Sequence, residues 1–160
     1  MLAAGGIGTA RGLAAVLAAG AAGGGVGTTF LTSTEAATSA GARELLVAAS
    51  DTDTVYGRVF DVGQRLAWPP EYGGRALRNA FFDRWVGRED ELAADDVAAA
   101  ELGAGRERGD FDVAYVYAGQ GVALLGAERT AADILGELAG AEALLERAAG
   151  QGRNDGSAGP

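Results

Sequence analysis

Two glycine-rich turns carry the clearest chemical signal in this 160-residue sequence. The first is Gly5-Gly6, and the second is Gly25-Val26-Gly27-Thr28. Because glycine has no side chain, the backbone N–H groups of such turns can approach a phosphate group closely. The hydroxyl of Thr28 adds one more donor. The two turns together therefore predict a phosphate-binding site.

The elements around these turns form one strand–helix–strand unit. Residues 2–4 are a short strand, and apolar Leu13, Val16 and Leu17 have the spacing of one helix face within a helix from Thr9 or Ala10 to Ala19. A second short strand covers residues 24–26. If the two strands are parallel neighbours, both turns leave the same edge and can bind one phosphate. In (β/α)₈ barrels the loops after strands 7 and 8 form such a site.

Two other interpretations of the turns remain open. In a chain with 27 glycines, both turns can be tight turns with no ligand. The segment from Gly6 to Gly12 also resembles a dinucleotide-binding fingerprint, but its glycine spacing is G-x-G-x-x-x-G rather than G-x-G-x-x-G. It also lacks an acidic residue about 20 positions further on.

Several short segments occur along the chain in a fixed order. They are AAGGI at 3–7, GTTF at 27–30, DTVY at 53–56, RVFD at 58–61, WP at 68–69, GRALRN at 74–79 and YAGQ at 117–120. This order resembles the nitronate monooxygenase family, also called 2-nitropropane dioxygenase-like, from about residue 2 to residue 148. The resemblance covers only the C-terminal half of that family.

The resemblance implies an α/β fold, namely the C-terminal portion of a TIM (β/α)₈ barrel with strands 7 and 8, and an appended, mostly helical segment. It implies FMN as cofactor and an oxidation of alkyl nitronates with dioxygen. The implied contacts to the flavin nucleotide are Gly6, Gly25, Val26, Gly27 and Thr28. The family's catalytic base is a histidine in a Gly-Gly-His stretch, and this chain contains no histidine. No catalytic residue is therefore assigned.

The sequence predicts four segments. Residues 1–50 form the end of the barrel, 51–125 an inserted helical segment, 126–149 a C-terminal helix and 150–160 a disordered tail. Thr32 with Glu35, and Thr130 with Asp133, have the spacing of capping boxes that start helices. Within 51–125, we expect β structure at 54–56 and 58–60, a turn region at 68–74, and helices over 76–108 with Leu77, Phe81 and Trp85 on one apolar stripe.

Other polar residues have less specific roles. Gln120 could face an active site or start a helix, and Tyr115 and Tyr117 are typical core residues. Arg75 and Arg78 could contact a partner, although surface ion pairs are the usual role. The acidic run from Glu89 to Asp96 is typical of a solvated face.

Composition excludes several kinds of chemistry. With a net charge of −9, all 13 basic residues being arginine, nucleic acid and anionic membranes are not expected partners. Without Cys, His or Lys there are no disulfides, no serine triad and no Schiff base, and no metal site is predicted. No signal peptide precedes the first apolar stretch, so a cytoplasmic location is expected.

Two hypotheses about function follow. The chain is part of an FMN-dependent enzyme of the nitronate monooxygenase type that acts on a small-molecule substrate and is inactive alone. Alternatively, it is a non-catalytic remnant or a subunit that needs a separate N-terminal half. A related flavin barrel, such as an enoyl reductase, would share the glycine turns. Strands without neighbours also predict self-association.

Overall fold

The computed structural model describes residues 1–155, with side chains up to residue 151. The chain folds into two compact units. The terminal unit combines Met1–Ala37 with the chain from Leu124 onward, and the inserted unit is Thr38–Ala123. These bounds differ from the expected segments 1–50 and 51–125, chiefly because the helix at residues 40–48 belongs to the inserted unit. The fold class is α/β, and the described residues contain two separate strand pairs and no closed barrel.

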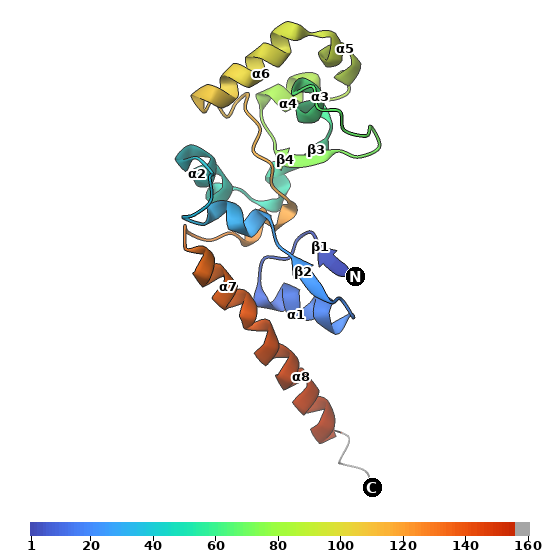
Figure 1. The fold of residues 1–160 in the computed structure, drawn as a ribbon, viewed down its shortest axis with the longest axis vertical. Coiled ribbons are helices and arrows are strands. Elements are labelled where there is room, and N and C mark those ends of the chain that lie inside the picture. Colours follow the sequence, from blue (N-terminus) through green and yellow to red (C-terminus); the bar gives the residue numbers. More distant parts are fainter. Residues whose placement is uncertain (156–160) are drawn as a thin grey trace. The chain divides into compact units, whose positions relative to one another are not determined.

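The terminal unit begins with the strand–helix–strand arrangement that the sequence predicts (Figure 1). Strand β1 is Leu2–Ala4, helix α1 is Ala10–Ala18 and strand β2 is Gly23–Gly25. The two strands are parallel neighbours, with Ala4 opposite Gly25. Thr9 caps α1 by accepting a hydrogen bond from the Gly12 N–H at 3.1 Å, and Gly20 follows the helix with a φ of 95°. Strand β2 lies one residue earlier than expected.

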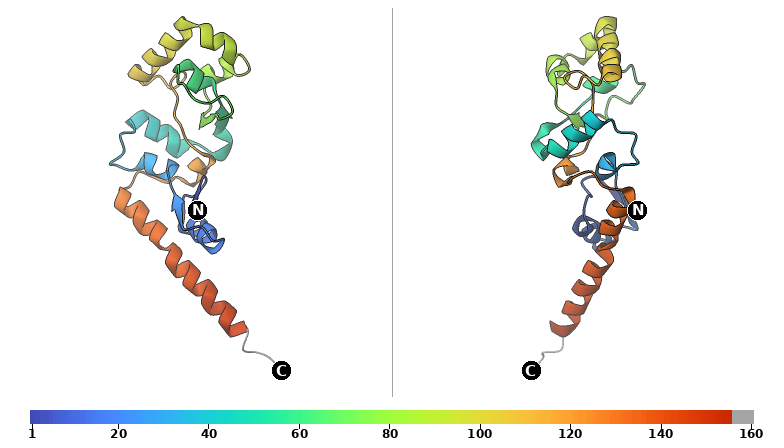
Figure 2. Two further views of the ribbon diagram at one scale, coloured as in Figure 1. Left: turned by 45° about the vertical axis from the view of Figure 1, so that its right-hand side comes forward. Right: turned by 90° about the vertical axis from the view of Figure 1, so that its left-hand side faces the viewer.

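Three further helices complete the terminal unit. They are the 3₁₀ helix η1 (Thr28–Thr32), α7 (Ala131–Ala139) and α8 (Ala141–Asp155). The capping box of Thr130 and Asp133 starts α7 as predicted, and Ile134 and Leu138 are buried. Helix α1 packs against α7 and α8. Figures 1 and 2 show α8 as a direct continuation of α7.

Two expectations for the C-terminal segment are wrong. The single helix at 126–149 is two helices, separated at Gly140, where a Cβ would lie 3.0 Å from the Glu137 carbonyl oxygen. Residues 150–155 are helical rather than disordered. Glycine lowers helix propensity without preventing an existing helix from adding hydrogen bonds. The rest of the expected tail, residues 156–160, lies outside the described part of the chain.

The capping box predicted at Thr32 and Glu35 is also wrong. Thr32 ends η1, and its hydroxyl donates backward to the Thr29 carbonyl oxygen at 3.1 Å. The Glu35 carboxylate accepts instead from the Ala131 N–H of α7 at 2.9 Å. The next helix, α2 (Ala40–Ala48), begins later and uses Ser39 as its N-cap. The Glu35 carboxylate, which a capping box would need, is thus hydrogen-bonded to a residue 96 positions away in the sequence.

The inserted unit alternates short strands and helices. After α2 come the 3₁₀ helix η2 (Asp51–Asp53), β3 (Thr54–Gly57), α3 (Val59–Gly63), β4 (Gly74–Leu77), α4 (Ala80–Trp85), α5 (Glu89–Ala94), α6 (Asp96–Arg108) and the 3₁₀ helix η3 (Gln120–Leu124), whose last residue is the first of the terminal unit's second segment. Strands β3 and β4 pair antiparallel, with Thr54 opposite Leu77. Gly109 ends α6 with a φ of 68°, in agreement with the expected end of the helices at residue 108.

Nine buried residues form the core of the inserted unit. They are Val59, Phe60, Ala76, Phe81, Phe82, Trp85, Leu92, Ala98 and Leu102. The Phe60 ring stacks near that of Phe81, with ring centroids 6.2 Å apart. Tyr115 and Tyr117 pack against this cluster, so their expected core role is confirmed. Burying each large side chain contributes roughly 1.5–3 kcal/mol, which makes this cluster the principal source of stability in the unit.

Two parts of this unit differ from the sequence prediction. Residues 58–60 were expected to be β structure, but Val59 starts helix α3 and lies fully buried in the core. Burial on a helix face outweighs the β-propensity of valine. Strand β4 was expected to be turn and helix, and it places Leu77 outside α4, the helix that buries Phe81 and Trp85. Residues 74–77 form a strand because they pair with β3. The local sequence pattern does not predict that pairing.

Candidate functional site

The two glycine turns leave the same end of one strand pair. Gly5 and Gly6 follow β1 directly, while Val26 and Gly27 follow β2. Because the strands are parallel with Ala4 opposite Gly25, the carboxyl ends of both strands lie side by side. The structure therefore brings together the two turns that the sequence predicts to act jointly.

Backbone conformation and open space suit these turns to a close ligand. Gly5 and Gly6 have φ values of 96° and 69°, which side chains rarely tolerate. A Cβ added at Gly5, Gly6 or Gly27 would meet no described atom within 4 Å. Gly27 has a φ of −113°, so open space and not a left-handed backbone distinguishes this position.

Packing within the terminal unit holds the two turns together. A Cβ at Gly8, just after the first turn, would lie 3.0 Å from Oγ1 of Thr29 in η1. A side chain at Gly8 would therefore require Thr29 to shift. Thr29 is itself buried, so η1 is fixed against the chain that follows β1. Gly27 is the N-cap of η1, and the start of that helix therefore lies next to the second turn.

The arrangement fits a phosphate group. Consecutive amides in glycine turns form concave sites for anions. Gly6 and Gly27 border open space, and the half-buried Thr28 starts η1. Gly25 differs from these two glycines, because it belongs to strand β2 and a Cβ added there would not enter open space. A Cβ at Gly25 would lie 3.4 Å from the Cβ of Ala4 in β1. Contacts of Gly6, Gly25, Val26, Gly27 and Thr28 with a flavin nucleotide remain predictions.

A polar network that the sequence did not reveal lies in the inserted unit. The Tyr117 hydroxyl donates to the buried Asp61 carboxylate, and Nε2 of Gln64 donates to the same hydroxyl at 3.0 Å. Burial and then the neighbouring Asp61 carboxylate raise the pKa of Tyr117 far above its ordinary value. Tyr117 therefore remains a neutral donor, and the network connects α3 with the segment before η3. The network therefore ties these two parts of the inserted unit together.

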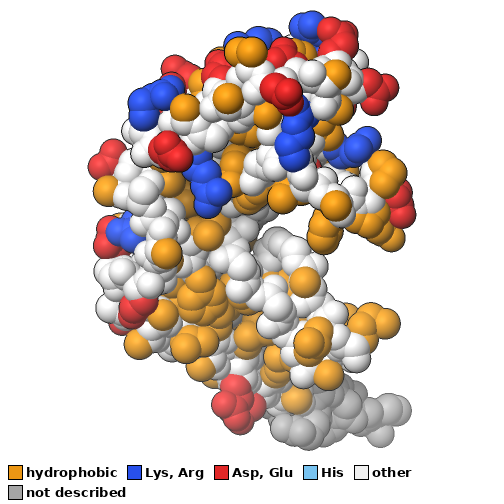
Figure 3. Space-filling view, turned by 45° about the horizontal axis from the view of Figure 1, so that its top comes forward, with side chains coloured by type: hydrophobic (Ala, Val, Ile, Leu, Met, Phe, Trp, Pro, Cys, Tyr) orange, Lys and Arg blue, Asp and Glu red, His pale blue; other side chains and the backbone are white. Residues whose placement is uncertain are grey.

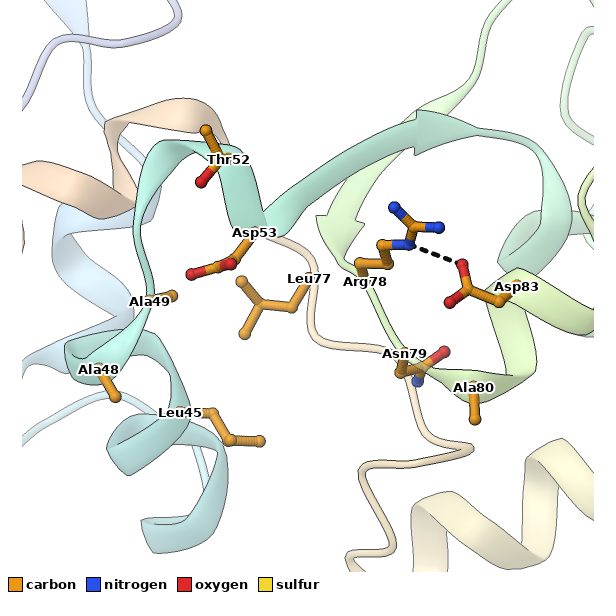
Figure 4. Close-up of a pocket in the computed structure, with 10 residues that line it drawn as sticks. All are labelled: Leu45, Ala48, Ala49, Thr52, Asp53, Leu77, Arg78, Asn79, Ala80 and Asp83. Atoms are coloured by element: carbon orange, nitrogen blue, oxygen red, sulfur yellow. Dashed lines mark hydrogen bonds and ion pairs between the residues drawn. The ribbon is translucent and has the colours of Figure 1, made fainter.

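The other polar candidates are Gln120, Arg75 and Arg78. Gln120 is exposed at the start of η3. Arg75 donates to the Thr54 hydroxyl at 3.1 Å. Arg78 pairs with Asp83 at 2.7 Å beside an open cavity of about 610 Å³ (Figure 4). The surface ion pair expected for Arg78 is therefore confirmed.

The acidic run between Glu89 and Asp96 is used locally. Glu91 pairs with Arg88, which lowers the pKa of the Glu91 carboxyl, and Asp96 pairs with Arg65. Asp95 caps α6 by accepting from the Ala98 N–H at 2.9 Å. Figure 3 shows acidic and basic side chains intermingled over the surface of α5 and α6. Among residues 1–155, no three acidic, histidine or cysteine residues are grouped in a way that suits a metal ion.

A parallel strand pair with two glycine turns at its carboxyl edge defines an α/β protein with a candidate phosphate site. A family model described as nitronate monooxygenase matches residues 1–140, and the chain belongs to that family. The family comprises flavin-dependent oxidoreductases. No curated protein sequence matches the chain. None of the helices within residues 1–155 combines the length and hydrophobicity needed to cross a bilayer.

Two solved structures resemble the chain over most of its length. FabK from Thermotoga maritima is 26% identical with a TM-score of 0.70, and the match covers 94% of this chain and 46% of FabK. A nitroalkane oxidase from Streptomyces ansochromogenes is 27% identical with a TM-score of 0.70, covering 92% and 40%. The chain thus spans less than half the length of either protein.

Proposed function

We propose that this chain contributes the phosphate-binding end of an FMN site in an oxidoreductase of the nitronate monooxygenase type. In this proposal β1 and β2 correspond to strands 7 and 8 of a (β/α)₈ barrel. The observation that carries it is the adjacency of the Gly5-Gly6 and Val26-Gly27 turns, with open space beside Gly5, Gly6 and Gly27. Family membership supports a flavin, and the geometry supports its phosphate end.

In this function the residues of the chain bind and position the cofactor. When bound, the flavin would supply the electron chemistry, and backbone amides of the two turns would fix its phosphate. The chain has no histidine, so the histidine base that the family resemblance implies would have to come from outside these 160 residues. The ring contacts and the substrate pocket would likewise come from the part of the matched structures that this chain does not span.

The experiment compares FMN with riboflavin, which has the same ring system and no phosphate. The chain is co-expressed with the part of the Streptomyces nitroalkane oxidase that it does not match, and the visible absorbance of the purified complex reports bound flavin. We expect the complex to retain FMN at least about tenfold better than riboflavin, since several charge-assisted hydrogen bonds depend on the phosphate. Equal retention of both flavins would contradict the proposal.

The reaction is tested on the same complex. Oxygen uptake with an alkyl nitronate tests the nitronate monooxygenase type, and NADH-dependent reduction of an enoyl thioester tests the alternative of an enoyl reductase. The equal TM-scores to FabK and to the nitroalkane oxidase are the reason for including both assays. A complex that retains FMN and catalyses neither reaction would favour a non-catalytic remnant.

A further inference from the structure

A cavity of about 420 Å³ lies wholly within the inserted unit, between the end of α3 and α6. Its volume is within the range of small-molecule sites, roughly 300–1,000 Å³. Its apolar wall includes Leu66 and Leu102, and its polar groups include Arg65, Arg106 and the Tyr115 ring. None of the residues lining it, all in the described part of the chain, is an aspartate or glutamate. Although the net charge of the chain is −9, this lining therefore contains two cations and no carboxylate.

Arg65 is committed to the fold. Its two Nη atoms donate to the backbone carbonyl oxygens of Leu92, Ala93 and Asp95 at 2.6–2.9 Å, and one of them also pairs with Asp96. These bonds cap the end of α5 and hold Arg65 at a φ of 60°, which a non-glycine residue adopts only when its surroundings enforce it. Arg65 therefore fixes one wall of the cavity and has little capacity left for a ligand.

Arg106 is different because its exposed guanidinium has no ion-pair or hydrogen-bond partner within the part of the chain whose side chains the structure describes, residues 1–151. It lies over the Tyr115 ring, with Cζ 5.4 Å from the ring centroid. This cation–π contact holds the guanidinium at the cavity wall while leaving its N–H donors available. A planar guanidinium with free donors matches the two oxygens of a carboxylate.

Gly103 keeps the cavity open on the α6 side. It lies one turn before Arg106 on the same helix, and a Cβ added there would meet no described atom within 4 Å. Leu102, by contrast, is fully buried, and its Cδ2 approaches the Cβ position of Gly63 to 2.7 Å. The floor is therefore closely packed and apolar, whereas the mouth is open next to Arg106.

We propose that this cavity binds a monocarboxylate attached to an apolar group, with the carboxylate on Arg106 and the apolar group against Leu66 and Leu102. A single uncommitted cation balances one negative charge. A phosphate dianion would bring a second charge that no available group in the cavity compensates. The larger cavity beside Arg78 lacks this feature, because Arg78 is already paired with Asp83. The proposal does not depend on the flavin site, which lies in the other unit.

Hexanoate is the probe, titrated into the full 160-residue chain and followed by calorimetry. Hexan-1-ol has the same tail without the charge, and inorganic phosphate has charge without a tail. Arg106→Gln should weaken hexanoate binding about tenfold or more, since a charge-assisted pair is lost. Gly103→Leu should weaken it similarly by filling the mouth. The matched control is Arg108→Gln, two residues along α6, where the arginine is exposed like Arg106 but lies outside the cavity lining and 3.8 Å from Asp110.

Saturable hexanoate binding that both cavity variants weaken and the control leaves unchanged would support the proposal. Equal affinity for hexan-1-ol would show that Arg106 does not select an anion and would overturn it. Equal affinity for phosphate, an equal loss in Arg108→Gln, or no saturable binding would overturn it as well. Thermal melts followed by circular dichroism confirm that each variant remains folded, and the two cavity variants provide independent readings.

Discussion

The inserted unit and the terminal unit use their residues in opposite ways. Of the eleven aromatic residues in the chain, only Phe30 belongs to the terminal unit. The inserted unit packs its aromatic and aliphatic side chains into one cluster. The terminal unit carries the glycine turns. Their glycines leave the backbone accessible and have no side chains to bury in a core. Residues that allow a ligand to approach the backbone cannot also build a core, so the candidate site lies in the unit with almost no aromatic side chains.

The strand pairs sharpen this contrast. In the inserted unit, β3 and β4 are covered by the aromatic cluster, with Ala76 buried. In the terminal unit, β1 and β2 have three residues each and form a two-stranded parallel sheet. Leu2 in β1 is 72% exposed. Two strands alone are marginal in water, and parallel sheets are normally covered on both faces.

The largest expected effect concerns catalysis. Neither unit supplies a histidine base, so the isolated chain should show no detectable nitronate oxidation. General-base catalysis alone contributes about 10²–10⁴-fold, and the positioning of substrate is missing as well. Oxygen uptake by the purified chain with excess FMN and an alkyl nitronate is compared with free FMN. Turnover above that blank would show that one unit carries an unrecognised catalytic group.

The next effect tests whether the glycine turns bind the phosphate. In the co-expressed complex, Gly27→Val should abolish FMN retention, whereas Gly103→Val should leave it unchanged. A phosphate bound by amides needs the backbone within about 3 Å, which a β-branched side chain at Gly27 prevents. The φ of −113° at Gly27 suits valine, so backbone strain does not explain a loss. A Cβ at Gly103 would likewise meet no described atom within 4 Å, but Gly103 belongs to helix α6 and not to the glycine turns. Equal flavin content in the two variants would remove the main support for the site.

Removing a buried aromatic ring from the inserted unit tests whether the two units differ in stability. Phe81 is 1% exposed, and Phe81→Ala should destabilise the inserted unit by about 3–5 kcal/mol. Val97→Ala is the control, since Val97 is 80% exposed on α6 and its loss should cost less than about 0.5 kcal/mol. Hydrogen exchange read separately in each unit gives the measurement. Equal loss of protection in both units would mean that they unfold together.

The terminal unit should make the isolated chain self-associate. The edges of β1 and β2 offer unpaired backbone groups, and Leu2 adds an exposed apolar side chain. Sedimentation velocity at several concentrations should show a rising average mass. A monomer at every concentration, with a sharp cooperative melt, would show that the short strand pair is stable without further neighbours.

Local signals explain what the sequence predicted correctly. The Thr130–Asp133 capping box starts α7, and the helical spacing of Leu13, Val16 and Leu17 lies within α1. These interactions span only a few residues, so a sequence pattern reports them. The adjacency of the two glycine turns was predictable for a related reason. One helix between two short strands leaves parallel pairing as the expected arrangement.

Distant contacts explain what the sequence missed. Glu35 bonds to α7 instead of capping a helix, and β4 exists because β3 pairs with it. The Asp61–Tyr117 hydrogen bond joins residues 56 positions apart. Gly74 belongs to the same group, since a Cβ there would lie 2.6 Å from the Tyr117 ring. Such requirements arise from tertiary packing, which single-residue propensities do not encode.

The smallest effect concerns the capping box of α7 in the terminal unit. Thr130→Ala should destabilise that unit by about 1 kcal/mol, because the Asp133 N–H loses its acceptor. The Thr130 hydroxyl and then its backbone N–H lower the pKa of Asp133 below the ordinary 3.8. A lowered pKa in the folded state stabilises the fold above pH 3.8, and this contribution disappears as the pH falls through the folded value. The destabilisation caused by Thr130→Ala should therefore be smaller at pH 3 than at pH 7.

Hydrogen exchange of the α7 amides measures this destabilisation. Thr52→Ala is the control, because it removes an exposed hydroxyl in the inserted unit. An effect independent of pH would show that Asp133 takes no part in the cap.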